Sequence, residues 1–532
     1  MTRVTTADRS LRSDSAGPDV SDAAHVRRRD RDVLRAVALA SVVIGAAAAL
    51  YYARAGLTLS HFDAKGHLVV ARRIIDSITP GWLQIGALWL PLPHLINLLP
   101  TQIDLFYRTG AFAVAVSIAA FGLAGWAIAS AILAGTGSRI AAVVGTAVFA
   151  TNPNVLYLQA TPMTEPLFWG LTCAAVVLAQ QAIATDSTTT RRRAGLALAA
   201  AVLTRYEAWP VCGALFALAA IALVWQGASW RDAMRRLTGL AVWPAVAILA
   251  FFVLGRLTIG EWFVRSGFFV PEPETLHQPI GSALAVWRGL NQLIAEPLAW
   301  IGVAGLATPI VVAVRDRKRA LGVVVLSVAA AGLLPWFAFY QGHVFRVRYM
   351  TALLPVVAIG TGLLIGRVNR LWTVAAAMVV LVALAIGPRP FDRLAAMPLE
   401  AQWDTSLRVG RRQVTAYLTR EWNGTPIMAS MGSLAHYMHE LSASGFRLRD
   451  FLHEGNGDVW LAALGEPAPY VEWILIEESA RGGDMLAALM RQRPTFLDGF
   501  DKVAAGGGTV LYRRHAGARS AGHQGAAPPL SP

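Results

Sequence analysis

The sequence predicts a mainly α-helical, polytopic membrane protein with a small α/β domain at its carboxyl-terminal end. Of its 532 residues, 55% are hydrophobic and only 15% are charged, and the mean hydropathy is +0.48, which is too apolar for a soluble protein of this length. Apolar runs recur between residues 33 and 387 and then stop. At roughly 20 residues per crossing, these runs predict about eleven transmembrane helices.

Each apolar run is interpreted as one helix because a short polar segment separates it from the next. The first run follows a group of arginines and has no signal-peptide cleavage site, so we expect it to remain as a membrane anchor. The run at 194–205 is too short to cross alone, and whether it crosses fully is left open. The runs are 33–52, 108–134, 139–158, 165–184, 194–205, 208–226, 239–258, 291–314, 320–340, 349–366 and 371–387.

The basic residues indicate the orientation of these helices. Arginines cluster before the first run and in every second connecting loop, as the positive-inside rule requires of cytoplasmic loops. We therefore expect the amino terminus to lie inside a bacterial cell, and the membrane module at 33–387 to place its long loop, 54–107, outside. The odd number of crossings places residues 388–515 outside as well. Residues 1–32 are polar and 516–532 are rich in Ala, Gly and Pro, so we expect both to be disordered.

The region 388–515 alternates between helical and strand periodicity, which predicts a small α/β domain. It carries no nucleotide-binding fingerprint, since its glycine run at 504–508 precedes a strand instead of opening a helix. No active site is indicated within this domain. The expected helices are 403–422, 433–441 and 484–491, and the expected strands are 426–430, 470–476 and 509–513.

Charge and cysteine content exclude two classes of site. The formal net charge is +14, but the basic residues are distributed among loops and not along one face, so we expect membrane lipids and not nucleic acid as a partner. Cys173 and Cys212 both lie in apolar runs, which leaves neither a disulfide framework nor a cysteine metal site. Any catalysis would use oxygen and nitrogen side chains.

The most informative stretch is 58–100, within the long outer loop. Its first part is charged and has helical spacing, and its second part is rich in Trp and Pro. This mixture does not cross a bilayer, so we expect an amphipathic segment that lies on the membrane surface, with Trp82, Trp89 and His94 at the level of the lipid headgroups.

Asp63 is the first candidate for chemistry in this stretch. A carboxylate at the membrane surface can accept a proton from a hydroxyl that attacks an activated carbon. His67 follows one helical turn later, and Arg72 has the planar guanidinium that suits a phosphate leaving group. The alternative is structural: Ser60 caps a short helix, Asp63 favours its dipole, and His67 is solvated.

Other charged residues lie at the outer ends of apolar runs. Glu165 is a functional candidate because it is a carboxylate at the boundary of an otherwise uncharged span, although a first-turn acid also suits a helix dipole. Arg205 and Glu207 flank Tyr206, and they serve either as a structural ion pair or in substrate binding.

Arg346 and Arg348 break the positive-inside pattern, because they lie in an outer loop. They would bind either lipid headgroup phosphates or the phosphate of a substrate. Alternating residues of an extended loop point to opposite sides, so we expect only one of the two to face the site.

Four segments together resemble bacterial multi-pass glycosyltransferases of the GT-C superfamily. The group that they resemble is similar to protein O-mannosyltransferases and lipid A aminoarabinose transferases, and the resemblance extends over most of 33–387. The segments are HFDAKGHLVVARRIIDSITPGWLQIGALWLPLPHL in the first outer loop, ATPMTEPLFW at 160–169, LTRYEAW at 203–209 and FRVRYMTALLP at 345–355.

The resemblance implies transfer of a sugar from a polyprenyl-phosphate or related lipid donor to a glycan, lipid or protein acceptor of the cell envelope. Asp63 matches the catalytic acidic residue of the first outer loop, and the displacement would invert the anomeric carbon. Many relatives have two adjacent acids there, whereas Asp63 is followed by Ala64. Glu165 is the expected second catalytic carboxylate.

Neither a cofactor nor a metal is predicted. Asp63 and His67, at positions i and i+4, could both reach a divalent cation, but two ligands make an incomplete site and no recognised metal spacing is present. The alternative function is a polytopic transporter or lipid flippase of the cell envelope. A transporter should carry ionisable residues at mid-span and show two related halves, and this sequence shows neither.

Overall fold

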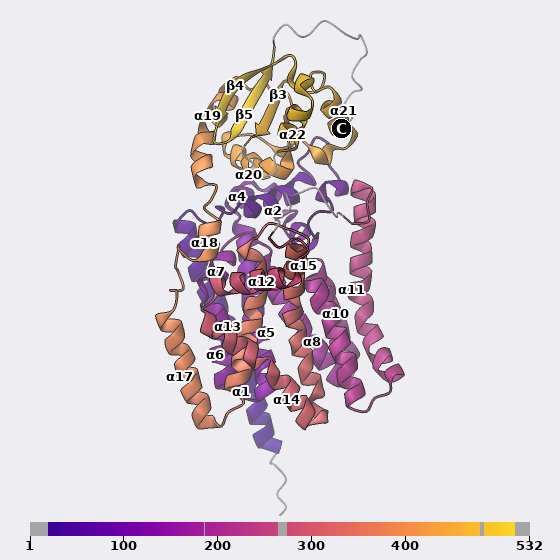
Figure 1. Ribbon diagram of the computed structural model, residues 1–532, viewed down its shortest axis with the longest axis vertical. Helices are drawn as coiled ribbons and strands as arrows, with labels where there is room; N and C mark the ends of the chain where they lie inside the picture. Colours follow the sequence, from indigo (N-terminus) through magenta and orange to yellow (C-terminus); the bar gives the residue numbers. More distant parts are fainter. Residues whose placement is uncertain (1–19, 186, 264–273, 479–483, 516–532) are drawn as a thin grey trace, which may run out of the picture.

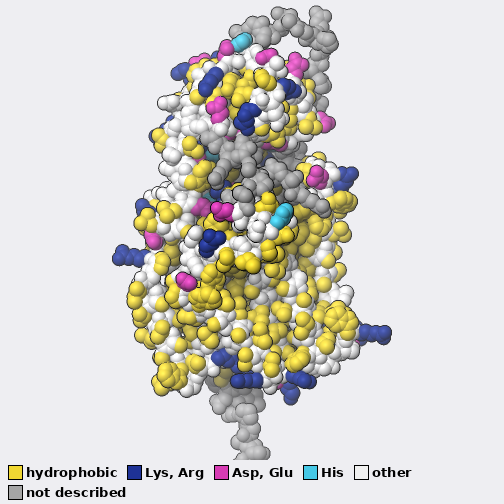
Figure 2. Space-filling model, in the orientation of Figure 1, with side chains coloured by type: hydrophobic (Ala, Val, Ile, Leu, Met, Phe, Trp, Pro, Cys, Tyr) yellow, Lys and Arg dark blue, Asp and Glu magenta, His cyan; other side chains and the backbone are white. Residues whose placement is uncertain are grey.

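The computed structural model describes residues 20–185, 187–263, 274–478 and 484–515. Figure 1 shows a bundle of long helices with a small sheet domain standing on one end of it. Hydrophobic side chains cover the body of the bundle, and Lys and Arg side chains gather at the end opposite the sheet domain (Figure 2). The chain is a multi-pass membrane protein.

Within the described residues, eight helical segments are long and apolar enough to cross a membrane. Three of them change helix type or break along their length, at the junctions between α13 and α14, η3 and α15, and η4 and α16. The segments are α1 (Val20–Arg54), α5 (Ala111–Thr136), α8 (Glu165–Thr185), α10 (Ala208–Trp225), α11 (Trp230–Ile259), α13 (Glu296–Gly305) with α14 (Ala307–Arg315), η3 (Arg317–Gly332) with α15 (Leu333–Tyr340), and η4 (Val347–Leu353) with α16 (Leu354–Ile365).

Two shorter apolar helices, α6 (Arg139–Ala150) and α17 (Arg370–Ile386), also lie in the bundle. The run expected at 139–158 divides because Asn152 caps a separate helix, α7 (Pro153–Leu158), whose first residue is proline. The run at 194–205 belongs to α9 (Thr188–Val202), which packs against α8 and α11. The number of about eleven crossings stays a prediction.

The prediction of disorder at 1–32 is wrong for residues 20–32, which form the first turns of α1. Arg139 holds this end of the helix, because its Nε lies 2.7 Å from Asp30 Oδ1 and its Nη2 donates to the carbonyl of Val26. Residues 1–19 and the tail at 516–532 lie outside the described residues.

Small residues allow the helices of the bundle to approach closely. A Cβ added to Gly305 of α13 would lie 1.8 Å from the carbonyl oxygen of Gly360 in α16, and a Cβ on Gly360 would lie 1.9 Å from the carbonyl oxygen of Gly302. Backbones in direct contact exclude any side chain there, as is common where transmembrane helices cross.

The C-terminal domain contains one five-stranded sheet in the order β2-β1-β3-β5-β4. The three expected strands are confirmed as β1 (Ile427–Ala429), β3 (Trp473–Glu477) and β5 (Thr509–Arg514). Two strands were not predicted: β2 (Phe451–Leu452) is very short, and the edge strand β4 (Phe500–Gly506) is largely exposed and lacks a hydrophobic pattern. The helices are α18 (Ala396–Glu400), α19 (Thr405–Glu421), α20 (Met431–Leu441), α21 (Asp458–Gly465) and α22 (Met485–Gln492).

The long loop 54–107 fills the space between the bundle and the sheet domain (Figure 1). Its helix α2 (Phe62–Arg73) packs against α20, and Leu68 and Val69 of α2 belong to the same hydrophobic core as Leu434 and Tyr437 of α20. The other helices of the loop are η1 (Trp82–Ile85), α3 (Leu92–Asn97), η2 (Pro100–Gln102) and α4 (Asp104–Thr109).

The expectation that this loop lies on the membrane surface is wrong for α2 and for His94, which are buried. Trp82 is exposed, with 65% of its surface accessible. The reason is tertiary: the C-terminal domain covers the second face of α2, so both faces of an amphipathic helix are removed from solvent. The loop and the domain therefore form one packed unit over the end of the bundle.

Candidate active site

Asp63 occupies the first turn of α2, where a carboxylate favours the positive end of the helix dipole. The helix is capped by His61, whose Nδ1 accepts a hydrogen bond from the backbone N–H of Asp63 at 3.1 Å. Ser60, the expected cap, instead lies 2.9 Å from the hydroxyl of Tyr157 and donates to the carbonyl of Leu57. Asp63 is thus held at the start of a helix that is fixed on both sides.

Arg348 joins Asp63 to Glu165. Its Nη1 lies 2.5 Å from Asp63 Oδ2, and its Nε lies 3.4 Å from Glu165 Oε1. The side chains are 18% exposed for Asp63, 12% for Arg348 and 1% for Glu165, so this contact lies in a nearly closed space. Three segments that are far apart in the sequence meet here: the start of α2, the start of α8 and the 3₁₀ turn η4.

Arg205 is a second arginine that contacts Glu165. Its Nη1 lies 2.9 Å from Glu165 Oε1 and 3.0 Å from Thr164 Oγ1, and its Nη2 lies 2.7 Å from Glu207 Oε1. Arg205 and Glu207 thus form an ion pair, which was one of the two alternatives for these residues. We call the five residues Asp63, Arg348, Glu165, Arg205 and Glu207 the charged cluster.

The charged cluster contains three carboxylates and two guanidinium groups, so it has one net negative charge when all are ionised. Burial by itself would raise the pKa of the Asp63 carboxyl, but the adjacent Arg348 guanidinium lowers that pKa below its usual value. Asp63 is therefore a carboxylate at neutral pH.

Three buried polar atoms of the charged cluster form no hydrogen bond among the described residues. Glu165 Oε2 is buried without a hydrogen-bond partner, and Nε and Nη1 of Arg348 form ion pairs without hydrogen-bond geometry. Buried polar atoms in native proteins are nearly always hydrogen-bonded, so these atoms have capacity for a further hydrogen bond. The atoms here include both donors and an acceptor.

His67 lies one helical turn after Asp63 and forms a pair with His94. The Nδ1 of His67 is 3.1 Å from Nε2 of His94, and Trp89 packs against the His67 ring with centroids 4.2 Å apart. Burial lowers the pKa of both imidazoles, that of His94 to about 3, so both rings are neutral at pH 7. One ring donates and the other accepts, which fixes the orientation of His67. His94 was expected at the headgroups, and no motif indicated this pair.

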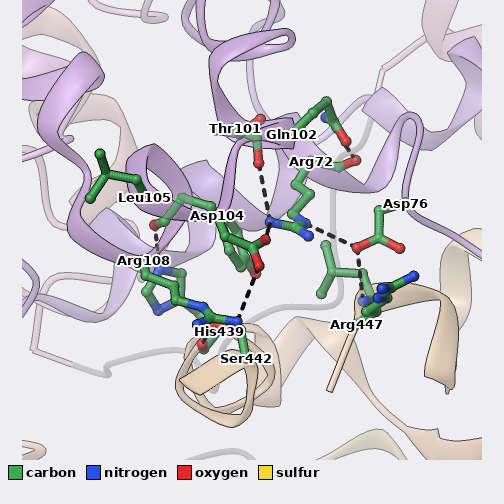
Figure 3. A network of polar contacts seen from close by, with 12 residues as sticks. Arg72, Asp76, Thr101, Gln102, Asp104, Leu105, Arg108, His439, Ser442 and Arg447 are labelled. Atoms are coloured by element: carbon green, nitrogen blue, oxygen red, sulfur yellow. Dashed lines mark hydrogen bonds and ion pairs between the residues drawn. The ribbon is translucent and has the colours of Figure 1, made fainter. Parts of the chain in front are cut away.

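Arg72 is not part of the charged cluster, and its expected role in holding a phosphate stays a prediction. Figure 3 shows its guanidinium between Asp76 and Asp104, with Nε 2.9 Å from Asp76 Oδ2 and Nη1 2.8 Å from Asp104 Oδ1. The guanidinium also lies 4.4 Å from the centroid of the Tyr107 ring. Asp76 continues the network into the C-terminal domain, where Arg449 Nε is 2.9 Å away. Arg72 connects the loop to the domain.

We expect Arg72→Gln to lower the stability of the protein by about 2 kcal/mol, because it leaves the buried Asp76 with one fewer cation. The measurement is the apparent unfolding temperature in detergent, together with the rate of proteolysis between the bundle and the C-terminal domain. Arg108→Gln is the control, since Arg108 pairs with the same Asp104 at 3.2 Å but is more exposed. Normal stability of Arg72→Gln combined with lost donor binding would support the role in holding a phosphate.

Two further expected site residues lie apart from the cluster. Arg346 is exposed, whereas Arg348 contacts Asp63. The hydroxyl of Tyr206 donates to the carbonyl of Leu88 at 3.1 Å, and its ring packs edge-on against Trp209 and Phe263. Tyr206 thus holds the long loop against the end of α10.

In the part of the chain that the structure describes, no three His, Cys, Asp or Glu side chains converge in a way that could hold a metal ion. A guanidinium, that of Arg348, lies between the carboxylates of Asp63 and Glu165. The arrangement provides an ionised carboxylate, a second carboxylate that holds two arginines, and a neutral imidazole one turn from the first carboxylate.

No protein-family model and no curated protein matches this chain. Among solved structures, the chain is similar to ArnT from Cupriavidus metallidurans bound to undecaprenyl phosphate, at 15% identity and a TM-score of 0.50, over 90% of this chain and 98% of the other. The apo state of the same protein matches at 15% identity and a TM-score of 0.52, over 88% and 97% of the two chains. The chain has the GT-C fold, as the sequence resemblance implied.

Proposed function

Starting from the GT-C fold, we propose that this chain is a membrane glycosyltransferase. It transfers a sugar from a polyprenyl-phosphate-type lipid donor to an acceptor of the cell envelope. The observation that carries the proposal is the contact of Asp63 and Glu165 through Arg348, which places a base and a phosphate-binding cation side by side. The similarity to ArnT, a protein seen with undecaprenyl phosphate, supports a lipid phosphate as the donor group.

Arg348 and Arg205 are the proposed phosphate-binding residues. Guanidinium groups bind phosphate oxygens through paired hydrogen bonds, and Nε and Nη1 of Arg348 contact carboxylates without forming hydrogen bonds to them. A donor phosphate would compete with Asp63 and Glu165 for Arg348. As the phosphate draws the guanidinium toward itself, Asp63 loses its counter-charge and becomes a stronger base.

The proposed reaction is a single displacement. The oxygen of an acceptor hydroxyl forms a bond to the anomeric carbon while the bond from that carbon to the phosphate oxygen breaks, and the electron pair of that bond leaves with the lipid phosphate. Asp63 accepts the hydroxyl proton, and the configuration of the sugar is inverted. The negative charge that develops on the phosphate is stabilised by Arg348 and Arg205.

Glu165 and Glu207 are proposed to position the two arginines, because each carboxylate contacts Arg205 and Glu165 also contacts Arg348. His67, whose ring is fixed by His94, is proposed to contact the sugar or the acceptor next to Asp63. Neutral imidazole can donate or accept a hydrogen bond without adding charge to the site.

The pH dependence of transfer follows from the lowered pKa of Asp63. A depressed pKa means that the base is present above it and is lost only as the pH falls through it. Titration of Asp63 should therefore not lower kcat/KM between pH 8 and about 4, the usual aspartate pKa, and the loss should begin only at lower pH. In Arg348→Lys or Arg348→Gln, the cation that opposes the effect of burial on the pKa of Asp63 is altered or removed. That pKa should rise, and the acid limb of the pH profile should move to higher pH. A limb in the wild type near pH 6.5 would instead indicate a histidine as the base.

The proposed orientation places the arginine-rich end of the bundle in the cytoplasm and the C-terminal domain outside. It is tested with single cysteines at Thr495 in the domain and at Arg192 at the opposite end, both exposed positions. The native Cys173 and Cys212 are buried and contribute little background. An impermeant thiol reagent applied to intact cells should label only the cysteine at 495.

The function is tested with the purified chain in proteoliposomes, supplied with radiolabelled polyprenyl-phosphate sugars and an envelope extract as acceptor. Covalent transfer of label to the acceptor supports the proposal. Accumulation of label inside sealed vesicles without a covalent product would support the transporter alternative and contradict it.

A further inference from the structure

A polar pocket lies on the C-terminal domain, outside the charged cluster. It has a volume of about 470 Å³, lies along α19, and is lined by Arg408, Arg411, Arg412, Arg420 and Glu440 among others. None of the five residues of the charged cluster lines it. The proposed transfer reaction does not use these arginines.

The carboxylates near this pocket are already neutralised by cations. Arg411 binds both oxygens of Asp404, at 3.0 and 2.6 Å, and lies 3.4 Å from Glu440. Glu440 also lies 2.5 Å from Lys65 Nζ and 3.5 Å from Arg408 Nε. Two carboxylates thus face three cations, and one positive charge remains before the other arginines are counted.

Arg412 increases this excess, because it is exposed and forms no ion pair among the described residues. Arg420 adds no net charge. It lies 2.8 Å from Glu421, and Arg513, 3.7 Å from the same carboxylate, also lies 3.2 Å from Glu472. The pocket therefore has an uncompensated positive charge, which attracts anions.

The arginines are spaced for an extended ligand. Arg408 and Arg412 are four residues apart and lie on one face of α19, and Arg420 follows after a further eight residues. At 1.5 Å per residue, the row from Arg408 to Arg420 is about 18 Å long. A row of this length suits a ligand with several separated negative groups better than it suits one isolated anion.

The pocket is connected to the helix that carries Asp63. Lys65, which contacts Glu440 in the pocket, is two residues after Asp63 in α2. The Phe62 ring packs on His436 of α20 with centroids 4.4 Å apart. A ligand held by α19 therefore contacts residues that are in direct contact with the first turn of α2.

We propose that this pocket binds phosphate or carboxylate groups of an anionic acceptor, and so selects an acceptor that carries several such groups. That the ligand is an acceptor rests on the proposed glycosyltransferase function. That the pocket binds anions does not. Figure 1 shows α19 beside the sheet, separated from the bundle by α18. This placement favours a ligand in the aqueous phase over a lipid headgroup.

The test uses the full chain in nanodiscs of zwitterionic lipid, with inorganic tripolyphosphate as the probe and calorimetry as the readout. We expect saturable binding that is weakened about fivefold in Arg412→Gln, the effect of one exposed charge pair, and about 20-fold in the double variant with Arg408→Gln. Arg491→Gln is the matched control, because Arg491 is an exposed arginine of the same domain that does not line the pocket. Equal affinity in all four proteins would overturn the proposal.

A second arm distinguishes lipid headgroups from an acceptor. Two results together would show that the pocket binds lipid headgroups, and the proposal would then fail. Discs of anionic phospholipid would abolish tripolyphosphate binding, and the wild type, but not the double variant, would incorporate into those discs in preference to zwitterionic ones.

Once transfer is established, Arg412→Gln should raise the KM for a polyanionic acceptor several-fold without changing kcat. The KM for a neutral acceptor should not change. If Arg412→Gln has the wild-type KM for each of the two acceptors, the inference is contradicted. Absence of transfer by the wild type would refute the proposed function, and the calorimetry would still decide whether the pocket binds anions.

Discussion

Asp63→Asn is expected to lower the transfer rate constant by about a thousandfold, within the range that a positioned general base contributes. Asparagine has nearly the same shape as aspartate, so it keeps the position at the first turn of α2 and a polar contact with Arg348. It has no basic oxygen that can accept the hydroxyl proton. The measurement is single-turnover transfer from a radiolabelled polyprenyl-phosphate sugar.

The structure also predicts what this variant retains. Arg348 still contacts Glu165 in Asp63→Asn, and the donor phosphate no longer competes with a charged Asp63, so the donor should bind at least as tightly as to the wild type. Asp498→Asn is the control for loss of one carboxylate, since Asp498 is exposed in the C-terminal domain. Normal transfer by Asp63→Asn in a correctly folded protein would refute the assignment of Asp63 as the base.

Arg348→Gln is expected to affect both stability and activity. It leaves two nearly buried carboxylates, Asp63 and Glu165, without their shared cation, and loss of one partner from a buried ion pair costs about 3 kcal/mol. It also removes a donor to the departing phosphate, which we expect to slow transfer by about a hundredfold. The apparent unfolding temperature and the rate of transfer are measured on the same preparation.

Two variants separate these effects. Arg346→Gln removes an exposed arginine two residues away and should change neither quantity by much. The double variant Asp63→Asn/Arg348→Gln removes one of the stranded charges, so it should recover part of the lost stability and none of the lost transfer. If Arg348→Gln is as stable and as active as Arg346→Gln, the proposed charged cluster has no role in either.

Much of the site could be predicted from the sequence because charge is rare in this chain. A carboxylate or an arginine at the outer end of an apolar run is conspicuous, and this signal alone indicated Glu165, Arg205 and Arg348. The alternation of Arg346 and Arg348 also indicated that only one would face the site. The structure brings the second of the two to Asp63.

The contacts that the sequence analysis missed share one cause. Arg72 has the same local signature as a phosphate-binding arginine, but its partner Asp104 is 32 residues away in the sequence and its network ends in the C-terminal domain. His94 was expected at the lipid headgroups, and its contact with His67 depends on how a Pro-rich loop folds back. Neither contact follows from local periodicity, because both depend on which surfaces meet.

The sequence by itself determined that the chain is a multi-pass membrane protein with an α/β domain, because hydropathy and periodicity are properties of single segments measured against water and lipid. Only the tertiary structure decided which charges meet. It buried α2 under the C-terminal domain and assigned Arg348 to Asp63 and Arg72 to the loop. It also placed too few carboxylates beside the arginines of α19 to neutralise their charge. These outcomes are decided by packing between distant segments, since a charge in a nearly closed space is stabilised by whichever partner the fold places beside it.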